Sequence, residues 1–377
     1  MKCKESSDQI SHEMMSSVET KLFSMQLDMS GADSSSKPIE DPMIRLNLLK
    51  LHGYKPVDAK TQWTSIEMFR NWTQLYKMQA AQPPKPLQEK QLILCIHGAG
   101  HSAAVFTLLA KEMAVGGYDT VAYDLRGHSL SPELQSDTAL DMDINSLVED
   151  FTEVLFSVGK GKSVLIVGHS LGGSIAARGL TQLLKNNQLL QDDHIQLAGL
   201  ILIEASEGLA IKHFPDMISF LDTRPKIFAN QELGIQWAVE HNQVFNPQSA
   251  RISIPTQLCP FQPSPSAAPA YTWLADPLSQ RRHWQGWFKG LTALVSALSL
   301  PKLLLAAGEG RIDQQLIRDA QDGLCSVAVV RNCGHSLMED DPREVGQLVG
   351  RFAEKCRDEA AGGFGGFKKK PKTGGSN

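Results

Sequence analysis

The strongest chemical signal in the chain is Gly168-His169-Ser170-Leu171-Gly172, which has the pattern G-x-S-x-G. The apolar run at 163–167 precedes this pattern, and an Ala-rich helical stretch at 174–184 follows it. A tight turn from a strand into a helix needs glycines, exposes the serine oxygen and points the amino end of the helix at it. The alternative is an ordinary glycine-rich turn, which need not lie between a strand and a helix. Because this pattern does lie there, it predicts Ser170 as the nucleophile of a serine hydrolase.

A second glycine-containing loop, His97-Gly98-Ala99-Gly100-His101, directly follows the apolar run at 91–96. Acyl transfer needs backbone N–H donors that face the oxyanion of the transition state. In hydrolases with a G-x-S-x-G turn, one donor comes from such a loop and the other from the residue after the nucleophile. We therefore expect the donors to be Ala99 and Leu171, with a plain βα turn as the alternative for this loop.

His335, in Cys333-Gly334-His335 just after the last apolar run, is the expected general base. The fold places its catalytic residues along the chain in the order serine, acid, histidine. His128 comes too early in that order, and His213 and His283 fall in a long inserted segment.

The acid has three candidates. It usually follows the next-to-last strand, but Gly310 and Arg311 occupy that position here and Asp313 is offset from it. Glu204 ends an earlier apolar run, at a sheet edge beside the serine turn, and a glutamate can orient a histidine as an aspartate does. We therefore favour Glu204, followed by Asp313 and then Glu207. The carboxylates not used would be solvated loop residues.

Several elements must position these residues. Short, nearly continuous apolar runs are typical of parallel strands that are buried on both faces. Such runs occur at 91–96, 120–125, 163–167, 199–205, 302–307 and 326–330. Helical patterns fall between several of the runs and after the last one, for example at 141–158 and 342–356. The alternation predicts an α/β-hydrolase fold, with a mostly parallel sheet flanked by helices.

We expect four parts along the chain. Residues 1–85 form a variable, partly disordered N-terminal region, and residues 358–377 form a flexible Gly/Lys-rich tail. Residues 86–208 and 298–357 form the hydrolase core. Residues 209–297 interrupt the alternation and are expected to form an inserted helical cap over the carboxyl ends of the strands.

The composition excludes several classes of function. With 37 Lys+Arg against 41 Asp+Glu and only 7% aromatic residues, the chain is not expected to bind nucleic acid. No apolar stretch reaches the ~18 residues of a membrane helix. Six scattered cysteines indicate neither a disulfide framework nor a metal site, which favours a cytoplasmic protein. The run Lys368-Lys369-Lys370-Pro371-Lys372 leaves a nuclear location open, although a solvated tail is the alternative.

The stretches LILCIHGAGHSA, VGHSLGGSIA, GLILIEASEG, HWQGWFKGL and CGHSLMEDDP together resemble the protein phosphatase methylesterases, an α/β-hydrolase family. The resemblance runs from about residue 90 to 356, and its cap stretches are the most specific because other esterases share the serine turn. In that family the acid lies in Ile-Asp-x-x-Glu-Gly, which places it at Glu204. This chain departs from the family in carrying Glu there, and in having a short Pro-rich loop at 260–269 in place of a long acidic insertion.

The resemblance implies a serine esterase, without metal or cofactor, that demethylates the C-terminal leucine methyl ester of the type 2A protein phosphatase catalytic subunit. That subunit would be its partner. The side chains of His101, Trp273, Trp284, Trp287 and Phe288 would then suit the substrate pocket, unless the aromatic residues only join the cap to the core. A small-molecule carboxylesterase or lipase, and a phosphatase-binding regulator that acts mainly by binding, are the alternative functions.

Overall fold

The computed structural model describes residues 54–69, 73–81, 91–128, 141–186, 191–262 and 268–361. All of them belong to one compact unit that spans residues 49–377. Most of the expected N-terminal region, residues 263–267 of the Pro-rich loop and the tail from residue 362 onward lie outside the described residues.

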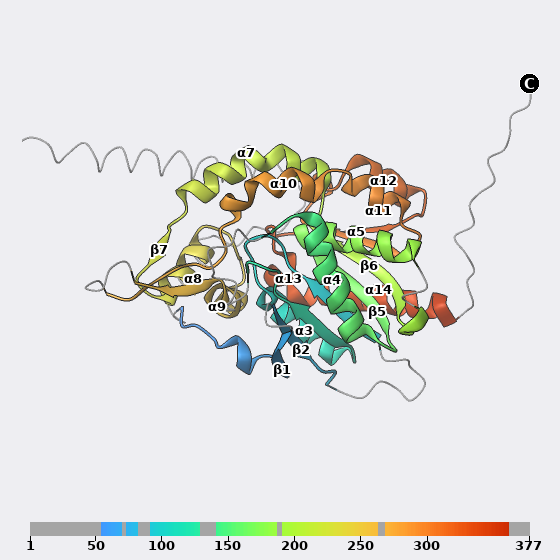
Figure 1. The fold of residues 1–377 in the computed structure, drawn as a ribbon, viewed down its shortest axis with the longest axis horizontal. Helices are drawn as coiled ribbons and strands as arrows, with labels where there is room; N and C mark the ends of the chain where they lie inside the picture. Colours follow the sequence, from blue (N-terminus) through green and yellow to red (C-terminus); the bar gives the residue numbers. More distant parts are fainter. Residues whose placement is uncertain are drawn as a thin grey trace, which may run out of the picture. The chain divides into compact units, whose positions relative to one another are not determined.

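An eight-stranded sheet forms the centre of the protein, in the order β1-β2-β4-β3-β5-β6-β10-β11 (Figure 1). The strands are β1 (Ser65–Phe69), β2 (Thr73–Met78), β3 (Gln91–Ile96), β4 (Asp119–Tyr123), β5 (Ser163–His169), β6 (Gln196–Ile203), β10 (Lys302–Ala306) and β11 (Ser326–Val329). The pairs β1–β2 and β2–β4 are antiparallel, and all other pairs of neighbours are parallel. Together with its flanking helices, this sheet confirms the predicted fold class.

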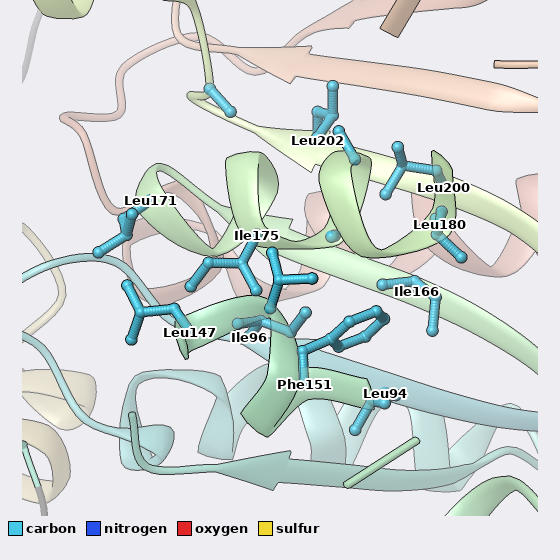
Figure 2. Packing of buried hydrophobic residues seen from close by; sticks show 14 of the residues in the cluster. Leu94, Ile96, Leu147, Phe151, Ile166, Leu171, Ile175, Leu180, Leu200 and Leu202 are labelled. Atoms are coloured by element: carbon cyan, nitrogen blue, oxygen red, sulfur yellow. The ribbon is translucent and has the colours of Figure 1, made fainter. Parts of the chain in front are cut away.

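Helices cover both faces of the sheet because its central strands are apolar on both faces. One apolar cluster joins the sheet to α4 (Ile144–Gly159) and α5 (Leu171–Lys185). Figure 2 shows Leu147 and Phe151 of α4 close to Ile175 of α5 in this cluster. A second cluster joins the opposite face to α3 (Thr107–Val115) and α14 (Pro342–Ala361).

The two antiparallel strands β1 and β2 lie before the expected start of the core at residue 86. Their sequences, SIEMF and TQLYKM, mix polar and apolar residues and contain no continuous apolar run. Such sequences suit strands near the edge of a sheet, where burial is incomplete. The sheet therefore begins before the expected core, in a segment where only weak alternation marked the strands.

The segment between β6 and β10 contains helices and a small sheet of its own. Its elements are α7 (Glu207–Thr223), β7 (Ile227–Phe228), α8 (Gln231–Glu240), α9 (Pro247–Thr256), β8 (Leu258–Phe261), β9 (Ala270–Trp273), α10 (Arg281–Phe288) and α11 (Leu291–Ala297). The three strands pair antiparallel in the order β7-β9-β8 and pack against α8 and α9. The cap is thus largely helical, as expected, with an additional three-stranded sheet.

Two further short α-helices lie in the part of the chain that the structure describes: α12 (Gln314–Gln321) and α13 (Leu337–Asp340). Among the described residues, no helix is both long enough and apolar enough to cross a membrane.

We predict that Gly179→Ala destabilises the protein, because a Cβ at this position would overlap the ring of Phe151 on α4. Overpacking of this kind costs about 1–3 kcal/mol of unfolding free energy. The control is Gly286→Ala, at an exposed helical position where a Cβ would meet nothing within 4 Å. This change should leave stability unchanged or raise it by up to about 1 kcal/mol. Urea unfolding of both variants checks the prediction, and equal midpoints would contradict it.

Candidate active site

Ser170 occupies a strained turn between β5 and α5. Its φ of 51° lies in the left-handed region, which residues other than glycine rarely adopt. The turn is compact: a Cβ on Gly168 would lie 2.5 Å from Cα of Gly173, so that position requires glycine. The N–H of Ser170 donates to the carbonyl of Ile203 at 2.9 Å, which fixes the turn to the neighbouring strand β6. The arrangement is the one that the G-x-S-x-G pattern predicts for an exposed nucleophile.

Glu204 and His335 meet at the carboxyl edge of the sheet. Nδ1 of His335 lies 3.3 Å from Oε2 of Glu204, which leaves Nε2 as the ring nitrogen that can accept a proton. The Glu204 side chain is only 1% exposed, whereas that of His335 is 45% exposed. A buried carboxylate therefore orients a solvent-accessible imidazole. This geometry is the one that an orienting acid requires.

Two further groups hold the Glu204 carboxylate. The N–H of Ala307 donates to Oε1 at 2.7 Å, and Nε of Arg311 donates to Oε2 at 2.5 Å. Burial raises the pKa of Glu204, but the hydrogen bond from His335 and the charges of Arg311 and His335 bring that pKa below its ordinary value. The carboxylate is therefore ionised at neutral pH despite its burial.

The other two candidate acids are bonded to the starts of helices. Asp313 accepts the N–H groups of Glu207 and Gly208 at 2.9 Å each, at the first turn of α7, and the hydroxyls of Ser206 and Thr292. Glu207 accepts the N–H groups of Gly290 and Thr292, at 2.8 and 3.0 Å, where α11 begins. These bonds satisfy helix-start donors that otherwise lack partners. The carboxylate bonded to His335 is that of Glu204.

Two buried histidines hold the glycine-containing loop of residues 97–101. Nε2 of His128 accepts the N–H of Gly100 at 2.8 Å, while Nδ1 of His128 donates to the carbonyl of Arg126 at 3.0 Å. His97, which belongs to the loop itself, bonds back to the segment that precedes His128: its Nε2 accepts the N–H of Leu125 at 2.9 Å. Burial lowers the pKa of His128 to about 4 and that of His97 well below its ordinary value. Both rings are therefore neutral and can accept these N–H groups.

The two expected oxyanion donors are the N–H groups of Leu171 and Ala99. Leu171 is the first residue of α5, so its N–H has no acceptor within the helix. His128 takes the N–H of the next residue, Gly100, so that N–H is not available, and Ala99 stays the donor expected from this loop. The loop approaches the serine closely: a Cβ on Gly98 would lie 3.0 Å from Cβ of Ser170.

His169 and His101 complete the cluster of rings around His335. The ring of His169 lies 4.7 Å from that of His335 and 5.2 Å from that of His101. Nε2 of His169 donates to the main-chain carbonyl of His335 at 2.9 Å. Burial lowers the pKa of His101 to about 3 and that of His169 well below its ordinary value. His101 is one of the residues expected in the pocket, whereas no sequence pattern pointed to the support that His169 gives to His335.

Three of the four aromatic residues expected in the pocket join the cap to the core. Trp284 and Trp287 are 2% and 1% exposed, and Phe288 is buried with them. Nε1 of Trp287 donates to the carbonyl of Met142 at 2.7 Å. Trp287 also borders a small cavity that Ala99 and Met142 line. Of these three residues, Trp287 thus has both a packing role and a place beside an expected oxyanion donor.

Trp273 belongs to a different cluster, within the cap. It packs edge-on against Phe228 and Trp237, with ring centroids 5.5 and 5.7 Å away. The guanidinium of Arg224 lies 4.7 Å from the Trp273 ring. The contacts therefore give Trp273 a role in the apolar core of the cap.

Comparison with known proteins identifies the family. The alpha/beta hydrolase family model matches residues 93–348. A probable protein phosphatase methylesterase 1 of Caenorhabditis elegans is 32% identical over 276 residues, which cover 72% of this chain and 71% of that protein. The human protein phosphatase methylesterase 1 is 30% identical over 321 residues, covering 73% of this chain and 79% of its own. The chain belongs to the protein phosphatase methylesterase family.

Solved structures agree on the fold of this methylesterase family member. E-2-(acetamidomethylene)succinate hydrolase superposes with a TM-score of 0.56 at 17% identity, over 75% of this chain and 95% of that one. An esterase from Mycobacterium tuberculosis superposes with a TM-score of 0.53 at 18% identity, over 84% of this chain and 98% of that one. At such identities the likeness concerns the fold alone.

We predict that Glu204→Gln lowers kcat by about four orders of magnitude without unfolding the protein, because it removes the charge that orients His335. Glu204→Asp should keep partial activity, since it preserves the charge on a shorter side chain. Asp313→Asn is the comparison: it should cost tenfold or less in kcat but about 1–3 kcal/mol of stability, because its amide nitrogen cannot accept the helix-start N–H groups. Steady-state kinetics and thermal unfolding decide, and a larger kcat loss in Asp313→Asn would contradict the assignment.

We also predict that acid weakens the fold through His128. Its pKa is about 4 in the folded protein and near 6.5 when unfolded, so the unfolded chain binds the extra proton first as the pH falls. Stability linked to His128 is therefore present above pH ~6.5 and is lost towards pH ~4, by about 1 kcal/mol per pH unit. His128→Gln should be less stable at neutral pH but lose less stability over this range.

Urea unfolding of His128→Gln and of the unaltered protein at several pH values checks this prediction. If stability changes with pH as steeply in His128→Gln as in the unaltered protein, the ring of His128 does not stay neutral in the folded state, and the prediction is wrong.

Proposed function

We propose that this protein is a serine esterase that removes a methyl ester from a protein phosphatase. The observation that carries the proposal is the contact between the buried Glu204 carboxylate and His335, at the sheet edge where Ser170 sits in its strained turn. Membership of the protein phosphatase methylesterase family supports the substrate class.

The proposed reaction begins at Ser170. Nε2 of His335 takes the hydroxyl proton as the serine oxygen bonds to the ester carbonyl carbon. The carbonyl oxygen becomes an oxyanion, which the N–H groups of Ala99 and Leu171 stabilise. Glu204 accepts the Nδ1 hydrogen bond throughout and stabilises the imidazolium that forms.

The second half of the reaction returns the enzyme to its starting state. The bond to the methoxy group breaks, and His335 gives its proton to that oxygen, so that methanol leaves. His335 then takes a proton from water while the water oxygen attacks the acyl-enzyme. The bond to Ser170 breaks, the serine regains its proton, and a free carboxylate is released. Apart from the attacking water and the ester, the groups that act in these steps are side chains and backbone N–H groups of this chain.

For the substrate, we propose the C-terminal leucine methyl ester of the type 2A phosphatase catalytic subunit. The cap supports a protein substrate, since it adds a separate apolar core and a small sheet beyond what an ester group needs. Contacts remote from the ester can lower the barrier at the ester when they strengthen in the transition state. Trp287, beside Ala99 at the small cavity, is the aromatic residue that we assign to the pocket.

We predict that the purified protein demethylates the methylated type 2A catalytic subunit, and that Ser170→Ala lowers the rate at least about 10³-fold. Mass measurement of the C-terminal peptide reads out the loss of the methyl group, and a fluorophosphonate should label one residue. The control is Ser157→Ala, at an exposed serine of α4, which should keep both activity and label. If the Ser170→Ala variant is still labelled, Ser170 is not the nucleophile. The protein would instead be a small-molecule esterase if it hydrolysed a panel of short acyl esters but left the phosphatase methylated.

A further inference from the structure

Arg311 lies at the place where most hydrolases of this fold carry their acid, in the turn after β10. Its Nε donates to Oε2 of Glu204 at 2.5 Å, and its Nη2 forms an ion pair with the same oxygen. Nδ1 of His335 bonds to that oxygen too, at 3.3 Å. Arg311 and His335 therefore share one carboxylate oxygen of Glu204.

The side chains of Glu204 and Arg311 are largely shielded from water. The Glu204 side chain is 1% exposed and that of Arg311 is 18% exposed. A carboxylate in such surroundings favours its protonated form unless opposite charges and hydrogen bonds stabilise the ionised one. One uncharged donor, the N–H of Ala307, reaches Oε1. Before His335 accepts the proton of the nucleophile its ring must be neutral, and at that point the positive charge next to the Glu204 carboxylate is that of Arg311.

We propose that Arg311 is a positioning residue for the reaction: it keeps the Glu204 carboxylate ionised and directed at Nδ1 of His335. The inference rests on the proposed esterase function and on the roles given there to Ser170, Glu204 and His335. Arg311 reaches the reacting atoms only through Glu204, so its effect should appear in the protonation of the Glu204–His335 pair.

The other titratable groups near the Glu204–His335 pair do not carry the positive charge that Arg311 carries. His169 and His101 lie around His335, and burial keeps both rings neutral. Asp340 approaches from α13 and accepts the N–H of Gly334 at 2.7 Å, beside His335. None of these groups contributes a positive charge to the carboxylate of Glu204.

The sign of the expected effect follows from the proton count. The active form has an ionised Glu204 and a neutral His335, and one extra proton on the pair inactivates it. Without the charge of Arg311, the pair holds that proton more tightly, whether it resides on the carboxylate or on the ring. The acid limb of the pH profile of kcat/KM should therefore move to higher pH.

The test compares Arg311→Gln, Arg311→Lys and the control Arg318→Gln on the full chain. Arg318 is an exposed arginine on α12, and its Nη2 donates to the side-chain oxygen of Gln315 at 2.8 Å. The rate of Ser170 labelling by a fluorophosphonate is measured from pH 5 to 9, alongside thermal unfolding. In Arg311→Gln the acid limb should rise by about one pH unit or more, as expected for loss of a neighbouring opposite charge. Arg311→Lys should keep the limb near its original position with a lower plateau, and Arg318→Gln should match the unaltered protein.

A uniform fall in rate at every pH, with the limb unmoved in Arg311→Gln, would overturn the inference and leave Arg311 a structural role. If Arg311→Gln does not fold, Arg311→Lys decides: a shifted limb or an unchanged plateau would overturn the inference. Because labelling needs no phosphatase, its result is separate from the proposed function. That function fails if the unaltered protein is labelled at Ser170 but leaves the methylated phosphatase intact.

Discussion

The site depends on one buried charge, the carboxylate of Glu204. Removing a carboxylate from water is costly unless donors surround it, and here the donors come from two separate loops. Ala307 and Arg311 follow β10, and His335 follows β11, so the carboxylate joins segments more than a hundred residues away in sequence. Strand order makes this possible, because β6 and β10 are neighbours and β11 adjoins β10. A parallel sheet thus brings these groups to the same edge.

The other histidines of the site carry no charge. His97, His128, His169 and His101 are kept neutral by burial, and three of them bond to backbone groups of loops that surround Ser170. Neutral rings can accept N–H groups, as His128 does, and they leave the field of the Glu204–Arg311 pair undisturbed. An oxyanion that forms beside Ser170 would then meet backbone dipoles in place of competing charges.

Local patterns in the sequence were enough to predict the fold, the turn between strand and helix that holds Ser170, and the loop before α3. Continuous apolar runs marked the six parallel strands, and glycines marked the turns where backbone approaches backbone. The sequence could not reveal contacts such as Arg311 with Glu204 or His128 with Gly100, because these depend on which loops the sheet brings together. Nor could it distinguish a pocket tryptophan from one that joins two layers, as Trp284 does, since both are aromatic residues in the same cap stretch.

Asp313 also has a bearing on how such a protein can evolve. It binds the start of α7, where the cap leaves the core, and the hydroxyl of Thr292, near where the chain returns. The two ends of the insertion are thereby fixed to a single point of the core. Insertions and deletions between them can lengthen, shorten or replace the cap without altering the spacing of β6 and β10. The segment between these two ends can therefore change without disturbing the sheet edge that carries Glu204 and His335.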